Sequence, residues 1–146
     1  MFREHRPDKK GIFLPPIEIK EHPQKGLICV ADTDILSGEL IERCPTIRFS
    51  SAAMKELYKL NGGQLIIHDY MYCRNQNGYA YWAMGYGGIY SHSSTPNARW
   101  AITYHQNGRH TIDIRAIKNI NKGEEITHSY VPKDDEASLW FDPIED

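Results

Sequence analysis

The most reactive group of neighbouring side chains in this 146-residue chain lies between Ser91 and Asn97, in the run SHSSTPN. A serine hydroxyl next to the His92 imidazole suggests the nucleophile and base of a hydrolase. Adjacent residues, however, do not usually bring a hydroxyl onto an imidazole nitrogen, and the chain has no Gly-x-Ser-x-Gly turn. The same residue types are ordinary turn formers, so the run on its own is typical of a polar loop. We therefore do not expect a hydrolase.

Cysteine and histidine spacing gives little support to a metal site. The three cysteines are widely spaced and form no Cys-x-x-Cys pair, which argues against both a zinc site and a disulfide framework. The seven histidines are scattered, and His105 and His110 are five residues apart across a predicted hairpin turn. No metal is expected.

The overall composition is that of an ordinary globular protein, with 40% hydrophobic and 25% charged residues. The length fits one domain. The longest apolar runs are too short to span a membrane, and the amino terminus lacks the apolar core of a signal peptide. A net charge of −2 gives the chain no excess of positive charge that would attract nucleic acid. These features predict an intracellular protein that contacts neither a membrane nor nucleic acid directly.

Short runs typical of β-strands dominate the chain. Hydrophobic and polar residues alternate in HTIDIRAI, where Ile112, Ile114 and Ala116 share one face. The Asn-Gly pair in HQNGRH lies between two such runs and is a strong hairpin signal. The predicted strands cover residues 17–20, 26–31, 40–47 with a break at Pro45, 98–105, 109–115 and 125–130.

One helix of about ten residues is predicted after Ser50 and Ser51. The following AAMKELYKL contains good helix formers, and Asn61-Gly62-Gly63 supplies a stop signal. Many short strands with few helices indicate a mainly β fold built from small sheets.

Three segments in a fixed order carry a family resemblance: GLICVADTDILSGELIERCP (26–45), GYGGIYSHSSTPNARW (85–100) and KGEEITHSY (122–130). Together they resemble the SET family of protein-lysine methyltransferases, most closely its small viral and bacterial members. The resemblance implies a SET domain (β-clip) of several small sheets, with a knot-like carboxy-terminal threading and one or two short helices. It places this domain at residues 16–131, followed by an acidic segment at 132–146 that closes the site or frays.

The resemblance implies S-adenosylmethionine as cofactor. Two positions depart from the family pattern: Ser91 stands where the family has asparagine, and Ile28 replaces the second glycine of a Gly-x-Gly turn. Because a β-branched residue resists positive φ, the turn must be shaped differently or the strand must begin earlier. The residues implied to contact the cofactor are Gly26, Leu27, Cys29, Ser91, His92, Tyr130 and Trp140.

Two tyrosines are implied to be catalytic. Tyr130 ends the family's last motif, and Tyr70, in the run HDY, resembles a tyrosine that enters the lysine channel. Tyr86 and Tyr90 are secondary candidates for the walls of this channel. The alternative for Tyr130 is an ordinary half-buried strand aromatic. Methyl transfer needs a neutral lysine amine, which a desolvating aromatic channel favours, so no metal is required.

The carboxy-terminal segment is rich in acids. Asp134, Asp135 and Glu136 would attract a basic substrate such as a histone tail, although a solvated tail is an equal alternative. Trp140 covers the site in one interpretation and anchors the tail on the core in the other. The resemblance implies a homodimer. The expected intracellular location is the cytoplasm or, in a eukaryote or its virus, the nucleus. The rival function is a catalytically silent SET domain that binds a peptide or protein.

The matched motifs also make a spatial prediction. We expect the last strand, near residues 126–130, to lie beside the loop 91–97, with Tyr130 within about two side-chain lengths of His92.

Overall fold

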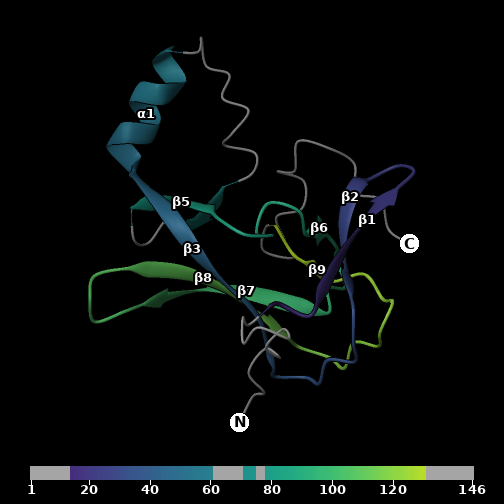
Figure 1. Cartoon of the computed structure of the whole chain (residues 1–146). Helices are drawn as coiled ribbons and strands as arrows, with labels where there is room; N and C mark the ends of the chain where they lie inside the picture. The colour runs from purple at the N-terminus through teal and green to yellow at the C-terminus, as the bar shows by residue number, and fades with distance from the viewer. Residues whose placement is uncertain (1–13, 61–70, 75–77, 131–146) are drawn as a thin grey trace. The chain divides into compact units, whose positions relative to one another are not determined.

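The structure of the chain, a computed structural model, describes residues 14–60, 71–74 and 78–130 and is mainly β in this part (Figure 1). The strands form a two-stranded sheet β1-β2, a five-stranded sheet of order β4-β5-β3-β8-β7, and a two-stranded sheet β6-β9. This arrangement confirms the predicted mainly β class of several small sheets. The elements are β1 (Ile17–His22), β2 (Gly26–Ala31), β3 (Leu40–Ser50), α1 (Ser51–Leu60), β4 (Tyr72–Arg74), β5 (Tyr79–Ala83), β6 (Ser91–His92), β7 (Ala98–Tyr104), β8 (His110–Ala116) and β9 (Thr127–His128).

Contacts within the chain define two compact units. The first unit comprises residues 1–43, 89–101 and 113–146, and the second comprises residues 44–88 and 102–112. Each unit has its own buried residues. Those of the first include Cys29, Ile35, Ile41, Ile114, Ile120 and Ile126, and those of the second include Cys44, Met54, Tyr72, Tyr81 and Ile112.

The hairpin β1-β2 explains how the chain tolerates Ile28. Its antiparallel register runs from Ile17 opposite Ala31 to His22 opposite Gly26. Gly26 takes φ of 81° at the turn, a conformation that glycine adopts without strain, whereas no residue other than glycine has positive φ in the described part. Ile28 is a regular strand residue opposite Lys20. The strand therefore begins at Gly26, before the position of the family's second glycine.

Two other predicted elements are confirmed. β7 and β8 are neighbours in the five-stranded sheet, joined by a turn in which Gly108 has φ of 83°. Helix α1 begins at Ser51, and the Ser50 hydroxyl accepts a hydrogen bond of 3.1 Å from the amide of Ala53. This bond satisfies one of the amides that the first turn leaves without a helical partner.

The predicted break at Pro45 is wrong, because β3 continues to Ser50. The ladder between β3 and β5 starts with Thr46 opposite Ala83, one residue after the proline. The missing proline N–H therefore falls outside this ladder, and the Pro45 carbonyl still accepts a bond of 2.8 Å from the amide of Met84. The last predicted strand is shorter than expected, and β4, β5 and β6 were not predicted.

None of the helices within the described ranges is long and apolar enough to cross a membrane.

Candidate functional site

The candidate site is built where β6 and β9 pair in parallel. Ser91 lies opposite Thr127 and His92 opposite His128, and the amide of Ser93 donates a bond of 3.0 Å to the carbonyl of His128. Residues 36 positions apart in the sequence are thus paired directly. The predicted neighbourhood of the last strand and the loop 91–97 is confirmed.

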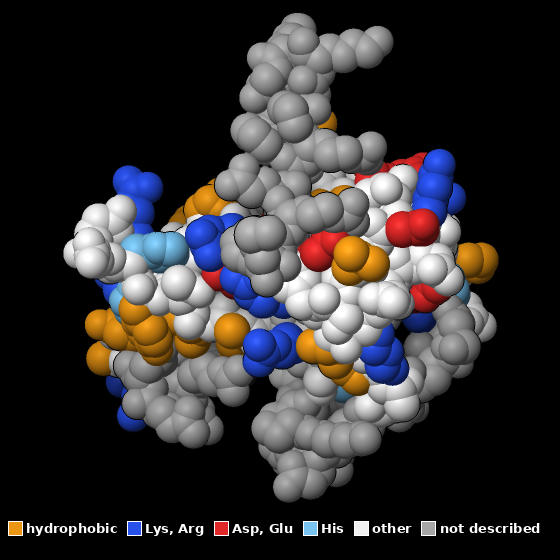
Figure 2. Space-filling view, turned by 90° about the horizontal axis from the view of Figure 1, so that it is seen from below, with side chains coloured by type: hydrophobic (Ala, Val, Ile, Leu, Met, Phe, Trp, Pro, Cys, Tyr) orange, Lys and Arg blue, Asp and Glu red, His pale blue; other side chains and the backbone are white. Residues whose placement is uncertain are grey.

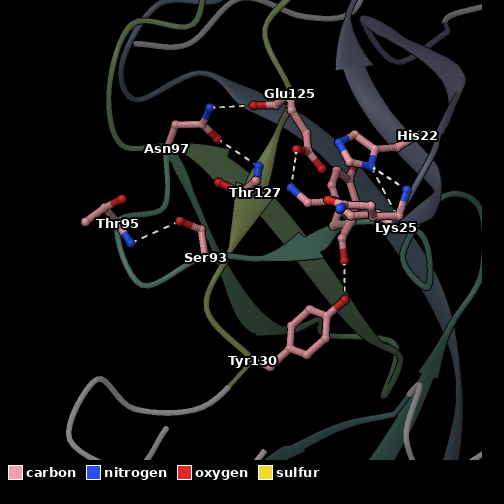
Figure 3. Close-up of polar contacts among 10 residues, drawn as sticks. His22, Lys25, Ser93, Thr95, Asn97, Glu125, Thr127 and Tyr130 are labelled. Carbon is pink, nitrogen blue, oxygen red and sulfur yellow. Dashed lines mark hydrogen bonds and ion pairs between the residues drawn. The ribbon is translucent and has the colours of Figure 1, made fainter. Parts of the chain in front are cut away.

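Asn97 fixes the approach to β9 with both ends of its side-chain amide (Figure 3). Its Nδ2 donates to the carbonyl of Glu125 at 2.7 Å, and its Oδ1 accepts from the amide of Thr127 at 2.9 Å. An asparagine amide can match a strand's N–H and C=O in this way because it carries one donor group and one acceptor. The loop therefore holds the last motif in register.

His92 and Tyr90 together fix Tyr130. The amide of Tyr130 donates to Nδ1 of His92 at 2.9 Å, and the two rings are 5.3 Å apart. At the other end of the side chain, the Tyr130 hydroxyl donates to the carbonyl of Tyr90 at 2.5 Å. Tyr130 lies within the predicted distance of His92, and its phenolic oxygen has a defined position and orientation.

Tyr90 is almost completely buried, with 1% of its surface exposed. Its hydroxyl donates to Oε1 of Glu42 at 2.7 Å, and Glu42 is itself buried. The carbonyl that receives the Tyr130 hydroxyl thus belongs to a residue anchored by its own side chain, which limits the freedom of Tyr130.

The His128 ring contacts two tyrosine rings, with centroids 5.8 Å from that of Tyr90 and 5.3 Å from that of Tyr130. Burial lowers the pKa of His128 to about 4, with a further lowering from His92 and an opposing effect from a backbone hydrogen bond at Ser129. The imidazole is therefore neutral at pH 7. A neutral ring at this position puts no fixed positive charge beside Tyr130.

The second half of β2 lies beside the segment that carries the last motif. Ile126 donates its amide to the carbonyl of Cys29 at 2.8 Å, and Val30 is bridged to Glu125. Lys25 forms an ion pair of 2.8 Å with Glu125, and only 10% and 16% of the two side chains are exposed. Burial raises the pKa of the Cys29 thiol, as do the charges of Glu42 and Glu125, so this thiol is unreactive.

The turn at Gly26 has room for a ligand. A Cβ built on Gly26 would meet nothing within 4 Å, and the Leu27 side chain next to it is 53% exposed. Ser91 is half-buried at the edge of the β6-β9 pair. An open glycine turn and a polar hydroxyl, both in the first unit, are consistent with the binding of a small polar cofactor such as the one the resemblance implies.

The structure locates some of the predicted site residues and leaves others untested. Gly26, Leu27, Cys29, Tyr90, Ser91, His92 and Tyr130 all lie in the first unit. Tyr86 is half-buried in the second unit. The remaining predicted residues lie outside the described ranges: Tyr70, Asp134, Asp135, Glu136 and Trp140.

Sequence reasoning gave no role to three residues that shape the site. Asn97 was matched only as part of a motif, and its two-ended bonding follows from the parallel pairing of β6 and β9. His128 shares a strand face with the buried Ile126, an alternation that could have predicted its burial. Glu42 is brought to Tyr90 across 48 residues of chain, and nothing local in the sequence signals this contact.

Known proteins share both the sequence pattern and the fold. The sequence pattern of the SET domain matches residues 26–131. A fission yeast (Schizosaccharomyces pombe) protein named as a histone-lysine N-methyltransferase specific for lysine 37 of histone H3 is 28% identical over 131 residues, which cover 90% of this chain and 80% of the relative.

Two solved structures extend the comparison. The crystal structure of a candidate histone methyltransferase of Plasmodium falciparum is 26% identical, with a TM-score of 0.64 over 88% of this chain and 98% of that one. A ctPRC2 structure bound to S-adenosylmethionine is 20% identical, with a TM-score of 0.61 over 80% of this chain and 15% of that one, and shows the shared fold. The matched residues 26–131 make up most of the chain and include β6, β9 and Tyr130, so the chain belongs to the SET-domain family of protein-lysine methyltransferases, which use S-adenosylmethionine.

Proposed function

We propose that this chain transfers a methyl group from S-adenosylmethionine to a lysine in a basic protein tail, with a histone tail as the substrate. The observation that carries the proposal is the fixed Tyr130 side chain, held at its amide by His92 and at its hydroxyl by the Tyr90 carbonyl. The match to the SET-domain pattern and the likeness to a fission yeast histone methyltransferase support it.

The chemical difficulty of the reaction is the charge of lysine. Only the neutral amine is nucleophilic, and with a reference pKa near 10.4 it lies roughly 4.6 kcal/mol uphill at pH 7 in water. S-adenosylmethionine, when bound, supplies a methyl group on a positively charged sulfur. A channel that removes water from the amine favours its neutral form, and tyrosine ring faces still tolerate residual positive charge.

Tyr130 is suited to orient such an amine. Because its hydroxyl proton is donated to the Tyr90 carbonyl, the phenolic oxygen would face a lysine amine as a hydrogen-bond acceptor. An acceptor at a fixed position turns the nitrogen lone pair in a defined direction, which favours a direct displacement. The neutral His128 ring packed beside Tyr130 adds no charge that would repel the substrate ammonium as it arrives.

The cofactor site in this proposal lies at the open turn of β2 and at the loop after Tyr90. Gly26 and Leu27 would contact the cofactor from the turn, with Cys29 contributing backbone only because its side chain is buried. The other contacts would come from Ser91, His92 and Tyr130, and from Trp140 as a cover.

Substrate recognition and assembly complete the proposal. The acidic residues 134–136 would attract the basic tail, with Tyr70, Tyr86 and Tyr90 around the lysine channel. A histone substrate implies an intracellular protein that works in the nucleus. We further propose a homodimer, to be tested by light scattering at tens of micromolar protein, where a monomeric mass would contradict it.

The test is incubation of the chain with labelled S-adenosylmethionine and a panel of purified histones and histone-tail peptides. We expect label on one or more lysines of a histone, located by mass spectrometry, and no label when that lysine is replaced by arginine. In a parallel incubation with cell lysate, labelling of other proteins with none on histones would support the methyltransferase activity and reject the histone substrate.

A second candidate, a silent SET domain that binds a peptide, is favoured by Ser91, which stands where the family has a cofactor-binding asparagine. Losing a hydrogen bond to a charged group would weaken cofactor binding by roughly 1.5 to 3 kcal/mol. Calorimetry with S-adenosylmethionine separates the candidates, since the silent domain predicts no binding. Ser91→Asn should tighten binding if the pocket keeps the family's shape.

A further inference from the structure

One face of the second unit combines exposed tyrosines with an arginine, and none of these residues has a role in the proposed methyl transfer. In the ladder between β3 and β5, Arg48 lies opposite Tyr81 and Ser50 opposite Tyr79. Side chains two residues apart in a strand lie on the same face, so Arg48, Tyr79 and Tyr81 project together. We call this group, completed by Tyr104 and His110, the tyrosine–arginine face.

Ring and cation contacts hold the tyrosine–arginine face together. His110 is at the centre, with ring centroids 5.8 Å from Tyr79, 5.8 Å from Tyr81 and 4.6 Å from Tyr104. The guanidinium of Arg48 lies 5.2 Å from the Tyr79 ring centroid, within the range of a cation–π contact. The rings and the cation are thus ordered before any partner arrives.

The hydrogen bonds of His110 leave the positive charge of Arg48 uncompensated at this contact. Arg48 Nη1 lies 2.8 Å from Nε2 of His110, and because arginine only donates, Nε2 is the acceptor. The other nitrogen, Nδ1, then donates to the Tyr81 hydroxyl at 2.7 Å. Desolvation, Arg48 and His105 lower the pKa of His110, which agrees with a neutral ring.

Part of the face is open to solvent. Tyr79 is 37% exposed and Tyr104 is 59% exposed, and Arg48 is also an exposed residue. Hydrophobic side chains lie next to histidine and Lys/Arg side chains at the left of Figure 2, the side on which the turn between β7 and β8 lies in Figure 1. Large exposed rings beside a cation are a surface that commonly serves binding.

The charge of the second unit differs from that of the whole chain. Its residues 44–88 and 102–112 hold five Lys/Arg and two Asp/Glu, against twelve and seventeen in the rest of the chain. The second unit therefore has a positive net charge, although the net charge of the whole chain is negative. The five cations are Arg48, Lys55, Lys59, Arg74 and Arg109.

We propose that the tyrosine–arginine face binds single-stranded nucleic acid. Exposed tyrosine rings on a sheet can stack with bases of any sequence, while Arg48 attracts the phosphates. An acidic peptide could use the cations but would gain little from the two exposed rings, so the combination favours nucleic acid. This site is independent of methyl transfer. It would make nucleic acid a direct partner, whereas the net charge of the chain led us to expect no such contact.

The experiment is fluorescence anisotropy with a labelled single strand of about 12 nucleotides, as RNA and as DNA, at about 50 and 150 mM salt. We expect a dissociation constant on the order of 1 to 100 µM at the lower salt, weakening as salt rises. Tyr104→Ala should weaken binding about tenfold. Arg48→Gln should reduce the salt slope of log Kd by about 0.7.

Two matched variants control for loss of an exposed ring and loss of an exposed cation. Trp82→Ala removes a ring that is 39% exposed on the opposite face of β5, and Lys118→Gln removes an exposed cation of the first unit. Both should bind like the original chain, and circular dichroism should show all four variants folded. Methylation of a short peptide should also be unchanged by Tyr104→Ala.

Several results would overturn the proposal. One is the absence of binding at about 100 µM protein and low salt. Another is an equal loss of affinity in Tyr104→Ala and Trp82→Ala. A third is a duplex of the same length that binds more tightly than the single strand. Displacement of the strand by poly-glutamate as efficiently as by unlabelled strand would also overturn it, in favour of an acidic peptide.

Discussion

The candidate site of the first unit and the tyrosine–arginine face of the second unit use their polar and aromatic side chains in different ways. In the first unit, Asn97, His92 and Tyr130 are bonded to backbone groups from distant parts of the chain. In the second unit, Arg48 and His110 bond to other side chains and leave rings exposed. Side chains that bond to backbone fix geometry, as a catalytic site needs, whereas side chains that bond to one another on a sheet present a surface. Mutations should therefore affect the units differently.

The largest loss of stability is expected at Asn97. Asn97→Ala removes two hydrogen bonds and leaves the Glu125 carbonyl and the Thr127 amide without these partners. At 1 to 3 kcal/mol for each group left unsatisfied, we expect a loss of about 3 kcal/mol in the free energy of unfolding, measured with urea. Asn119→Ala is the matched control, because Asn119 bonds one exposed amide, that of Ser37, and should cost under about 1 kcal/mol.

In the second unit, the next largest loss of stability is expected at Gly87, where the packing leaves no room for a side chain. A Cβ on Gly87 would lie 2.4 Å from the Cβ of Ala83 and 3.3 Å from the sulfur of Cys44. Gly87→Ala should therefore cost about 2 kcal/mol through overpacking. A Cβ added at Gly88 would meet nothing within 4 Å, so Gly88→Ala should change stability by less than about 1 kcal/mol. Equal effects of the two substitutions in urea unfolding would show that this contact does not constrain the turn.

A smaller effect is expected from the titration of His128. Its pKa is about 4 in the folded chain and near 6.5 when unfolded, so below pH 6.5 the unfolded state binds the proton first. This contribution to stability is complete above pH 6.5 and is lost as pH falls toward 4. Between about pH 7.5 and 5.5 we expect a loss of about 1.4 kcal/mol from this residue.

The measurement is urea unfolding at both pH values for the original chain and for His128→Gln. Other histidines titrate in both proteins, so the difference between their pH dependences isolates His128. The same pH dependence in the two proteins would mean that burial of His128 does not control its protonation.

The sequence predicted the elements whose signals are local. The Asn-Gly turn before β8, the serine cap of α1 and the strand from Gly26 all lie where their residue types indicated. Strand β6 was not predicted, because its two residues acquire strand geometry only through Thr127 and His128. Strands β4 and β5 were also not predicted, and they are defined by pairing with each other and with β3. Pro45 does not break β3, since its missing amide hydrogen falls outside the ladder between β3 and β5.

For the site, the motifs brought the right segments together but did not reveal how they are held. The proximity of Tyr130 and His92 followed from the family resemblance. The bonds from Asn97 to the last motif and from Tyr90 to Glu42 depend on the packed three-dimensional arrangement, and no sequence spacing encodes them. Likewise, the net charge of the whole chain does not reveal the positive charge of the second unit, because that unit combines two separate stretches of the sequence.

The central claim is that Tyr130, fixed by His92 and the Tyr90 carbonyl, orients the lysine amine. Its most direct test is the turnover of Tyr130→Phe with S-adenosylmethionine and a histone substrate, beside calorimetry of cofactor binding. Tyr104→Phe serves as the control for loss of an exposed tyrosine hydroxyl. We expect Tyr130→Phe to slow turnover about a hundredfold, near 2.7 kcal/mol, with cofactor affinity and fold retained. Methyl transfer by Tyr130→Phe at the rate of the original chain would contradict it.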